Sequence, residues 1–186
     1  MKIDIDALNR FHDSGTLIRE KFGDARETAC LMSALTGGTN FKQCESAGWP
    51  RWLAELGALL FDQSPGGVSA WQFATEFSAA VRDADARKVD WHRVFCAIRK
   101  DSILPIAREA IGDGDEPWRI ACRDAVDSVL RTGEVAETAR ATRATRAAAT
   151  AAAAAGATWA AAYARITEST IRCIQDAGLG EESCLV

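Results

Sequence analysis

Residues 49–60 read WPRWLAELGALL, and the spacing of their apolar side chains decides the fold class. The large apolar residues recur at intervals of three and four: Trp52, Leu53, Leu56, Leu59 and Leu60. This is the repeat of one face of an α-helix. Pro50 lies just before the pattern, where proline is tolerated because the first turn of a helix leaves its N–H groups unbonded. The stretch therefore predicts an amphipathic helix that begins near Pro50.

Other segments of the chain repeat this helical spacing. Residues 28–35 carry it up to Gly37, and glycine is a common residue just beyond a helix end. Another apolar stripe runs from Trp71 to Val81, after a break made by one proline and two glycines in residues 64–67. No run alternates apolar and polar residues in the way that a half-buried strand does. The sequence therefore predicts an all-α fold.

Prolines mark helix starts in the second half of the chain. We expect a helix over residues 91–100 and a break at residues 101–102. Ser102 would then cap a short helix that has Pro105 in its first turn. Pro117 is expected to open a further helix, since proline is favoured at the first helical position.

Residues 134–177 differ from the rest because alanine dominates them, with one internal glycine, Gly156, and no proline. Alanine has the highest helix propensity of all residues. One straight helix of this length would extend about 66 Å, whereas a compact domain of this size is about 40 Å across. The segment therefore either breaks near Gly156, which we favour, or projects and packs against another chain.

The whole chain has 186 residues, 48% apolar and 26% charged, with a formal net charge of −4. This composition is typical of one folded domain. We expect a single-domain helical bundle of about seven or eight helices with a long alanine-rich C-terminal helical segment. Within it, residues 1–133 would form the helical core, residues 134–180 the alanine-rich segment, and residues 181–186 a flexible tail.

Targeting features are missing from the sequence. Residues 1–6 carry acids where an export signal needs an apolar run, and residues 147–164 are too rich in alanine to be a convincing membrane span. We therefore predict a cytoplasmic protein that makes no membrane contact and keeps its cysteines reduced.

His92 and Cys96 are the strongest candidates for chemistry, because residues four apart share one face of a helix. The pair could supply two metal ligands, or a thiolate with its base. A metal site would need two further ligands, and the chain contains only two histidines. A cysteine within an apolar helical pattern usually packs as a small hydrophobic residue. We favour packing, and assign no catalytic residue, no metal and no cofactor.

Arg140, Arg143 and Arg146 recur at every third residue of the alanine-rich segment. They are the one local concentration of like charge in the chain, and could bind phosphates or an acidic patch on a partner protein. A solvated helix face is the competing interpretation. Nucleic acid is the weaker functional option, because three arginines supply few phosphate contacts. Trp159 and Tyr163, one helical turn apart, are either core residues or an aromatic anchor for a partner.

Two stretches resemble uncharacterised helical proteins of phages, prophages and mobile elements, including immunity-like and inhibitor-like accessory proteins. One comprises residues 29–35 (ACLMSAL), Cys44 and residues 49–56 (WPRWLAEL), and the other is the alanine-rich tail with Trp159 and Tyr163. The resemblance covers about a third of the chain and contains no catalytic motif. It implies a small accessory protein that acts by contact.

These observations favour a non-enzymatic macromolecular interaction protein, whose partner is another protein such as a host defence protein that it inhibits. The alternative from a different class is a small helical enzyme or ligand sensor that uses His92 and Cys96. A third interpretation makes the alanine-rich segment a dimerisation element, so a homodimer stays open.

Overall fold

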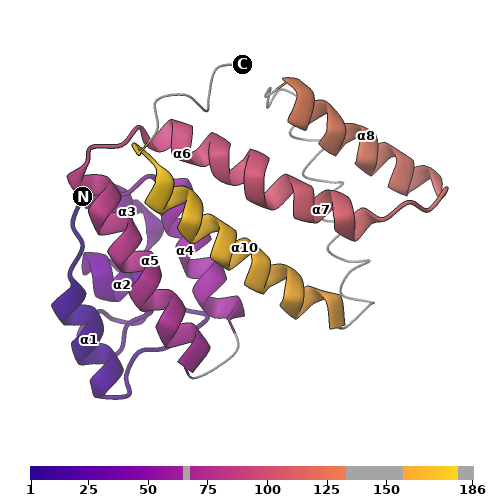
Figure 1. Cartoon of the computed structure of the whole chain (residues 1–186). Coiled ribbons are helices and arrows are strands. Elements are labelled where there is room, and N and C mark those ends of the chain that lie inside the picture. Colours follow the sequence, from indigo (N-terminus) through magenta and orange to yellow (C-terminus); the bar gives the residue numbers. More distant parts are fainter. Residues whose placement is uncertain (65–67, 133–156, 180–186) are drawn as a thin grey trace. The chain divides into compact units, whose positions relative to one another are not determined.

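Over the residues that the structure describes, the protein consists of α-helices joined by loops, with one π-helical turn (Figure 1). This computed structural model describes residues 1–64, 68–132 and 157–179. Within these ranges there is no β-strand, and the β-type pairing consists of isolated bridges from Ala29 to Leu17 and Gly23. The predicted all-α fold is confirmed.

The chain divides into two compact units, Met1–Trp91 and His92–Val186. The predicted division at residue 133 falls at the start of a stretch outside the described residues, and so does the predicted break at Gly156. The predicted flexible tail, residues 181–186, lies outside them as well. These three points stay predictions.

The first unit contains α1 (Ile5–Asp13), α2 (Leu31–Thr36), α3 (Phe41–Ser46), α4 (Arg51–Gln63) and α5 (Val68–Ala86). Helix α4 is the helix predicted from residues 49–60, and Pro50 occupies its N-cap position. Helix α2 ends as predicted at Gly37, whose φ of +76° is a left-handed conformation that glycine adopts without strain. Helices α1 and α3 were not predicted from the sequence.

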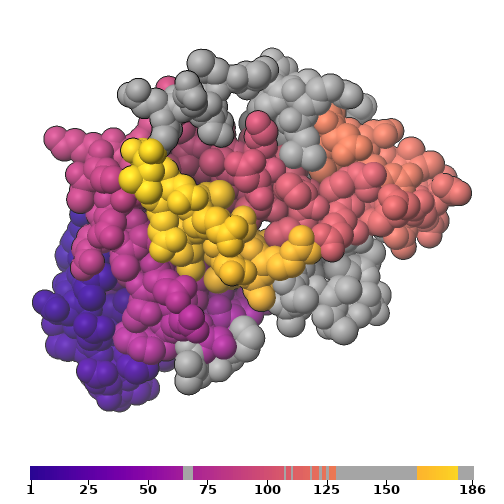
Figure 2. Space-filling model, in the orientation of Figure 1, coloured from indigo at the N-terminus to yellow at the C-terminus, as the bar shows by residue number. Residues whose placement is uncertain are grey.

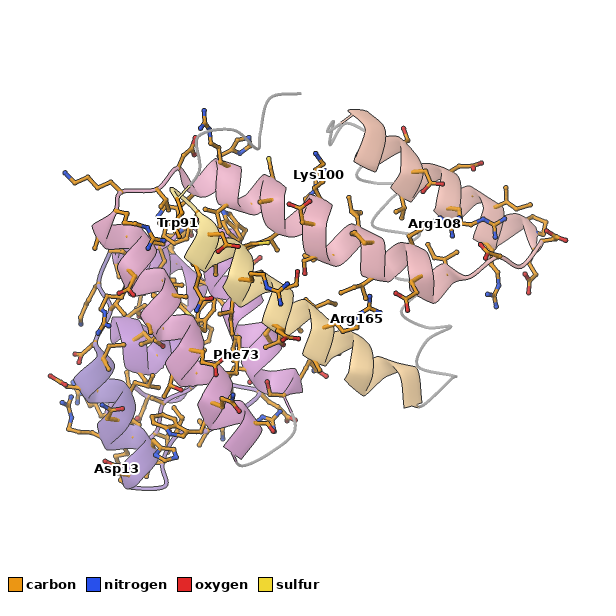
Figure 3. The ribbon with its side chains drawn as sticks, in the orientation of Figure 1. Asp13, Phe73, Trp91, Lys100, Arg108 and Arg165 are labelled. Atoms are coloured by element: carbon orange, nitrogen blue, oxygen red, sulfur yellow. The ribbon has the colours of Figure 1, made fainter. Side chains whose placement is uncertain are left out.

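Aromatic rings fill the interface between α4 and α5. Phe77 is 0% exposed, and its ring centroid lies 5.3 Å from that of Phe73 and 6.3 Å from that of Trp49. Phe73 lies among the helices of this unit (Figure 3). Gly57 of α4 faces Phe77 so closely that a Cβ added there would lie 2.7 Å from the ring. The missing side chain therefore lets the two helices approach.

The second unit contains most of α6 (Trp91–Ile98), the π-helix η1 (Arg99–Ile103), α7 (Leu104–Ile111), α8 (Pro117–Thr132) and α10 (Ala157–Asp176). The prediction of a break at residues 101–102 was wrong, because the chain continues from α6 into α7 through η1. Ser102 is buried inside η1 and caps nothing. Pro105 does lie in the first turn of α7. Its missing N–H removes one α-type hydrogen bond, and the widened turn absorbs that loss without ending the helix.

Arginine side chains tie the helices of the second unit together. Arg165 of α10 contacts Glu109 of α7 at 2.6 Å, and Arg108 contacts Asp127 of α8 at 3.3 Å (Figure 3). Arg119 donates a hydrogen bond to the carbonyl oxygen of Ile111 at 2.6 Å. That oxygen lies at the C-terminus of α7, where carbonyls lack helical partners and a cation is favourable. Among the described helices, none is both long enough and apolar enough to cross a membrane.

Replacing Gly57 with alanine should destabilise the protein. Alanine gains about 1 kcal/mol of helix propensity, but overpacking against a buried ring costs about 1–3 kcal/mol. We expect a net loss of about 1 kcal/mol in the free energy of unfolding, measured by urea denaturation. In a Phe77→Leu background the ring is gone, so the same Gly57→Ala change should cost less. Equal costs in both backgrounds would show that the ring does not oppose the new methyl group.

Candidate functional site

The structure leaves most of the predicted partner-binding residues untested. Arg140, Arg143 and Arg146 lie outside the described residues. Trp159 belongs to α10, but its side chain is also outside them. Tyr163 is half-buried on α10, and this burial raises the pKa of its phenol above the usual value. These assignments therefore stay predictions.

His92 and Cys96 do come together on α6, as their spacing predicts. Cys96 Sγ lies 3.8 Å from His92 Nε2; His92 is exposed, whereas Cys96 is half-buried. Within the described residues, no three side chains of His, Cys, Asp or Glu approach closely enough to hold a metal ion. The pair is thus a half-buried thiol beside an exposed imidazole on one face of α6.

Two other cysteines are buried in the first unit. Cys30 and Cys44 are 5% and 0% exposed, and burial raises the pKa of both thiols. Cys30 Sγ accepts a hydrogen bond from the backbone N–H of Ser33 at 3.5 Å, which makes Cys30 the N-cap of α2. Thr36 Oγ1 lies 3.7 Å from Cys44 Sγ. Both thiols have structural roles and are poor nucleophiles.

A hollow of about 600 Å³ lies on the first unit, and we call it the N-terminal groove. It is lined by α1, by the loop that follows α1, and by α2. Its charged and aromatic side chains are Lys2, Asp4, Arg10, Phe11, Arg26 and Glu27. In the space-filling view, the region of α1 (indigo) forms part of the surface of this unit (Figure 2). The groove is therefore built from several short segments of residues 2–37, all within the first unit.

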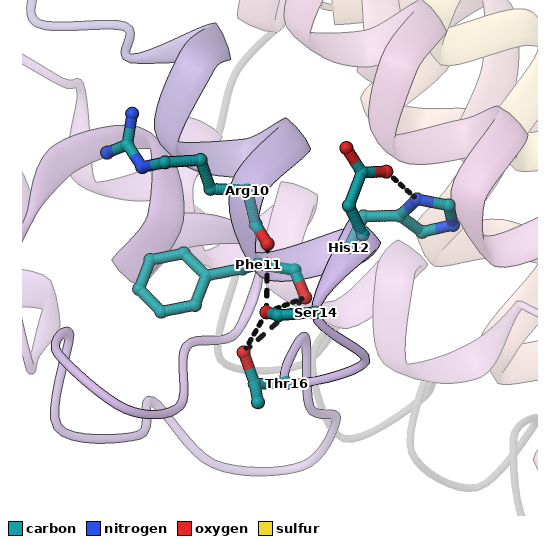
Figure 4. Close-up of polar contacts among 6 residues, drawn as sticks. Arg10, Phe11, His12, Ser14 and Thr16 are labelled. Atoms are coloured by element: carbon teal, nitrogen blue, oxygen red, sulfur yellow. Dashed lines mark hydrogen bonds and ion pairs between the residues drawn. The ribbon is translucent and has the colours of Figure 1, made fainter.

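The end of α1 is capped by hydroxyl groups, which frees Arg10 for other contacts. Ser14 Oγ donates to the carbonyl oxygen of Arg10 at 2.8 Å, and it lies 2.7 Å from Thr16 Oγ1 (Figure 4). Figure 4 shows the side chains of Arg10 and Phe11 projecting to one side of the helix end and His12 to the other. Because the hydroxyls satisfy the terminal carbonyls, the guanidinium of Arg10 is not needed as a helix cap.

The loop that carries Arg26 is held by one carboxylate. Asp24 Oδ1 accepts hydrogen bonds from the backbone N–H groups of Arg26, Glu27 and Thr28 at 2.9, 2.8 and 3.0 Å. These bonds favour the ionised form and lower the pKa of Asp24 from 3.8 to about 2. Gly23 precedes the turn with a φ of +77°, and a Cβ there would overlap the Thr28 carbonyl oxygen. The loop thus presents Arg26 on a fixed backbone.

The third cation, Lys2, is positioned by the core. Trp49 Nε1 donates a hydrogen bond to the carbonyl oxygen of Lys2 at 2.7 Å, and the N–H of Lys2 donates to the oxygen of Ala47 at 2.8 Å. The Lys2 ammonium lies beside Gly37 at the C-terminus of α2. A cation is favourable there because of the helix dipole. The backbone of Lys2 is thus hydrogen-bonded to the buried Trp49, and the Lys2 side chain lines the groove.

The three cations of the groove are exposed. In the described part of the chain, no ion pair involves Lys2, Arg10 or Arg26. Of the two acids that line the groove, Asp4 accepts the N–H of Ala7 at 2.8 Å as the N-cap of α1. The three cations outnumber the two acids by one, so the groove combines a small excess of positive charge with the half-buried ring of Phe11 and can attract an anionic group.

Sequence reasoning missed this groove because it missed α1. The signal was present: Asp4 is a favoured N-cap residue, and Leu8 and Phe11 follow at helical spacing. The presence of Arg10 and Arg26 in one groove carried no such signal, since it depends on the path of an irregular loop.

Thiol reactivity tests the burial of the cysteines. We expect iodoacetamide to modify Cys96 before Cys30 or Cys44 in the folded protein, because the thiolate is the reactive species and burial suppresses it. Mass spectrometry after brief exposure measures the order. In denaturant the three should react alike. Equal rates for Cys30 and Cys96 in the folded protein would contradict the buried environment of Cys30.

The role of Asp24 is testable by NMR. Its carboxyl carbon should titrate with a midpoint of about 2, so the carboxylate supports the loop fully above pH 3.8 and loses this effect as the pH falls through about 2. Asp24→Ala should speed hydrogen exchange of the amides of Arg26, Glu27 and Thr28, whereas Asp13→Ala should leave them unchanged. A midpoint near 3.8 would show that the three hydrogen bonds are absent.

Comparison with known proteins leaves the groove without a precedent to draw on. No protein-family model, no curated protein and no solved structure matches this chain. The resemblance to helical proteins of phages and mobile elements therefore stays a prediction from the quoted residues. A functional proposal for this protein therefore depends on the geometry of the chain itself.

Proposed function

We propose that this protein is a non-enzymatic interaction protein that acts by binding another protein. The observation that carries the proposal is the N-terminal groove, where Lys2, Arg10 and Arg26 surround a hollow without ion-pair partners among the described residues. Unpaired charge around a concave surface favours encounter with a partner of opposite charge. The expected cytoplasmic partner, a host defence protein that is inhibited by contact, is part of the same proposal.

Exposed apolar side chains support a binding role, although each is a common feature by itself. Leu59 of α4 is 46% exposed and Ile120 of α8 is 41% exposed. On α4, Trp52 and Leu56 precede Leu59 on one helix face and are half-buried. Such surfaces contribute area to an interface once a charged anchor has positioned the partner. The arginines at positions 140, 143 and 146 are proposed as a second contact surface.

Affinity capture tests the proposal. The wild-type chain should retain a specific protein from bacterial lysate, and the purified partner should bind it in isothermal titration calorimetry. Arg10→Glu should weaken that binding about tenfold, because it replaces an attraction by a repulsion, and Arg143→Glu tests the second surface in the same way. Arg82→Glu on α5, which contributes no residue to the groove, is the matched control. Failure to retain any partner would overturn the proposed function.

The 3.8 Å approach of Cys96 to His92 keeps the enzyme or sensor alternative open. If the imidazole activated the thiol, His92→Ala would slow alkylation of Cys96 several-fold. Under the interaction proposal we expect a change of less than about twofold. Mass spectrometry at several times gives the rate. A large decrease in this rate would favour the enzyme or sensor alternative.

Light scattering of the purified protein would test the separate interpretation that the alanine-rich segment is a dimerisation element.

A further inference from the structure

We propose that the N-terminal groove binds an extended segment of the partner protein that carries carboxylate side chains beside an apolar one. This inference rests on the proposed function and names what the groove recognises. It follows from the kinds of side chain that line the groove, from their charge, and from the way the fold holds them.

The cationic side chains suit carboxylates. Arg10 and Arg26 carry guanidinium groups, and a guanidinium can bind a carboxylate through two parallel hydrogen bonds. Lys2 adds a third positive charge. They come from α1, from the loop after it and from the segment before it. A ligand that meets all three must therefore present its anionic groups along a length of chain, as an extended peptide does.

The groove also offers some apolar surface, most of it from the half-buried ring of Phe11. Ala7 and Ala34 line the groove as well, but they are only 7% and 2% exposed and add little to this surface. An apolar residue placed between two acidic ones in the partner could therefore pack against Phe11 while the carboxylates pair with the cations.

A peptide fits the charge pattern better than a nucleic acid does. Asp4 and Glu27 stand among the three cations, and the whole chain has a formal net charge of −4. A nucleic acid carries a phosphate at every step, so some of its charges would meet these carboxylates. A peptide can place its acids where the cations are and neutral residues elsewhere.

The groove is organised before a ligand arrives. Asp24 fixes the loop of Arg26, Ser14 caps the helix of Arg10, and Trp49 holds the backbone of Lys2. Binding then orders the cationic side chains and the peptide without ordering the backbone of the protein. A fixed backbone lowers the entropic cost of association, which makes a short segment a sufficient ligand.

Fluorescence anisotropy with synthetic peptides tests the inference. The probe is a labelled peptide of about ten residues with glutamates interspersed among leucine, glycine and serine, and its counterpart carries glutamine in place of each glutamate. We expect the glutamate peptide to bind the full chain and the glutamine peptide to bind at least about tenfold more weakly. Raising the salt concentration should weaken binding of the glutamate peptide, because the charges are exposed.

Variants locate the peptide on the chain. The double variant Arg10→Glu/Arg26→Glu should lose at least about tenfold in affinity for the glutamate peptide. The control Lys42→Glu/Arg82→Glu makes the same change in net charge with exposed residues that do not line the groove, and should stay within about twofold of wild type. Circular dichroism checks that both variants remain helical. Equal losses in the two variants would overturn the inference.

A further arm separates the inference from the proposed function. A single-stranded DNA oligonucleotide of the same charge should bind more weakly than the glutamate peptide. If the oligonucleotide binds more tightly, and the Arg10→Glu/Arg26→Glu variant abolishes this binding, the groove is a nucleic-acid site and the inference is overturned. If the lysate partner binds but is insensitive to the groove variant, the inference fails while the proposed function stands. If the peptide binds at the groove but no partner is captured, the proposed function fails alone.

Discussion

The contact between Gly57 and Phe77 is the constraint on which the first unit depends. A Cβ on residue 57 would overlap the ring, so the missing side chain sets how closely α4 and α5 approach. Phe77 in turn stacks near Trp49, the residue that begins the stretch leading into α4. Burying the rings of Phe77 and Trp49 near each other contributes to the apolar stabilisation of this unit. The close approach of α4 to α5 therefore depends on a residue without a side chain at position 57.

The same core places the charged surface. The indole of Trp49 is 2% exposed, yet its N–H needs a partner, and the carbonyl oxygen of Lys2 provides it. The N–H of Asp4 donates to the Leu35 carbonyl oxygen at 2.9 Å, which joins the start of α1 to the end of α2. The buried indole of Trp49 therefore helps to position the segment that carries Lys2, which the bond from Asp4 to Leu35 joins to α2. A change in the core would move the groove as well as lower stability.

The sequence predicted the helices whose apolar residues are closely and regularly spaced. Helices α4 and α5 were predicted from stripes of tryptophan, leucine and phenylalanine, and the end of α2 from Gly37. At residues 101–102 the prediction failed because a break and a π-helical turn both accommodate Pro105, and tertiary packing chooses between them. The groove could not be predicted, because the loop between α1 and α2 follows hydrogen bonds such as those of Asp24, which leave little trace in a sequence pattern.

The loop after α1 shows how an irregular segment can hold a precise surface. Asp24 uses a single carboxylate oxygen for three backbone donors, and Ala25 adopts a left-handed φ of +60° that a residue with a side chain rarely adopts. Such a conformation persists only where the surrounding hydrogen bonds favour it more strongly than the local strain opposes it. Arg19 adds to them by donating to the carbonyl oxygens of Asp62 and Ser64 at the end of α4. One part of the loop is thus hydrogen-bonded to the end of α4 through Arg19, and another part, residues 25–27, lines the groove. These hydrogen bonds explain how a strained backbone at Ala25 can persist beside Arg26, in the groove that would bind the proposed ligand.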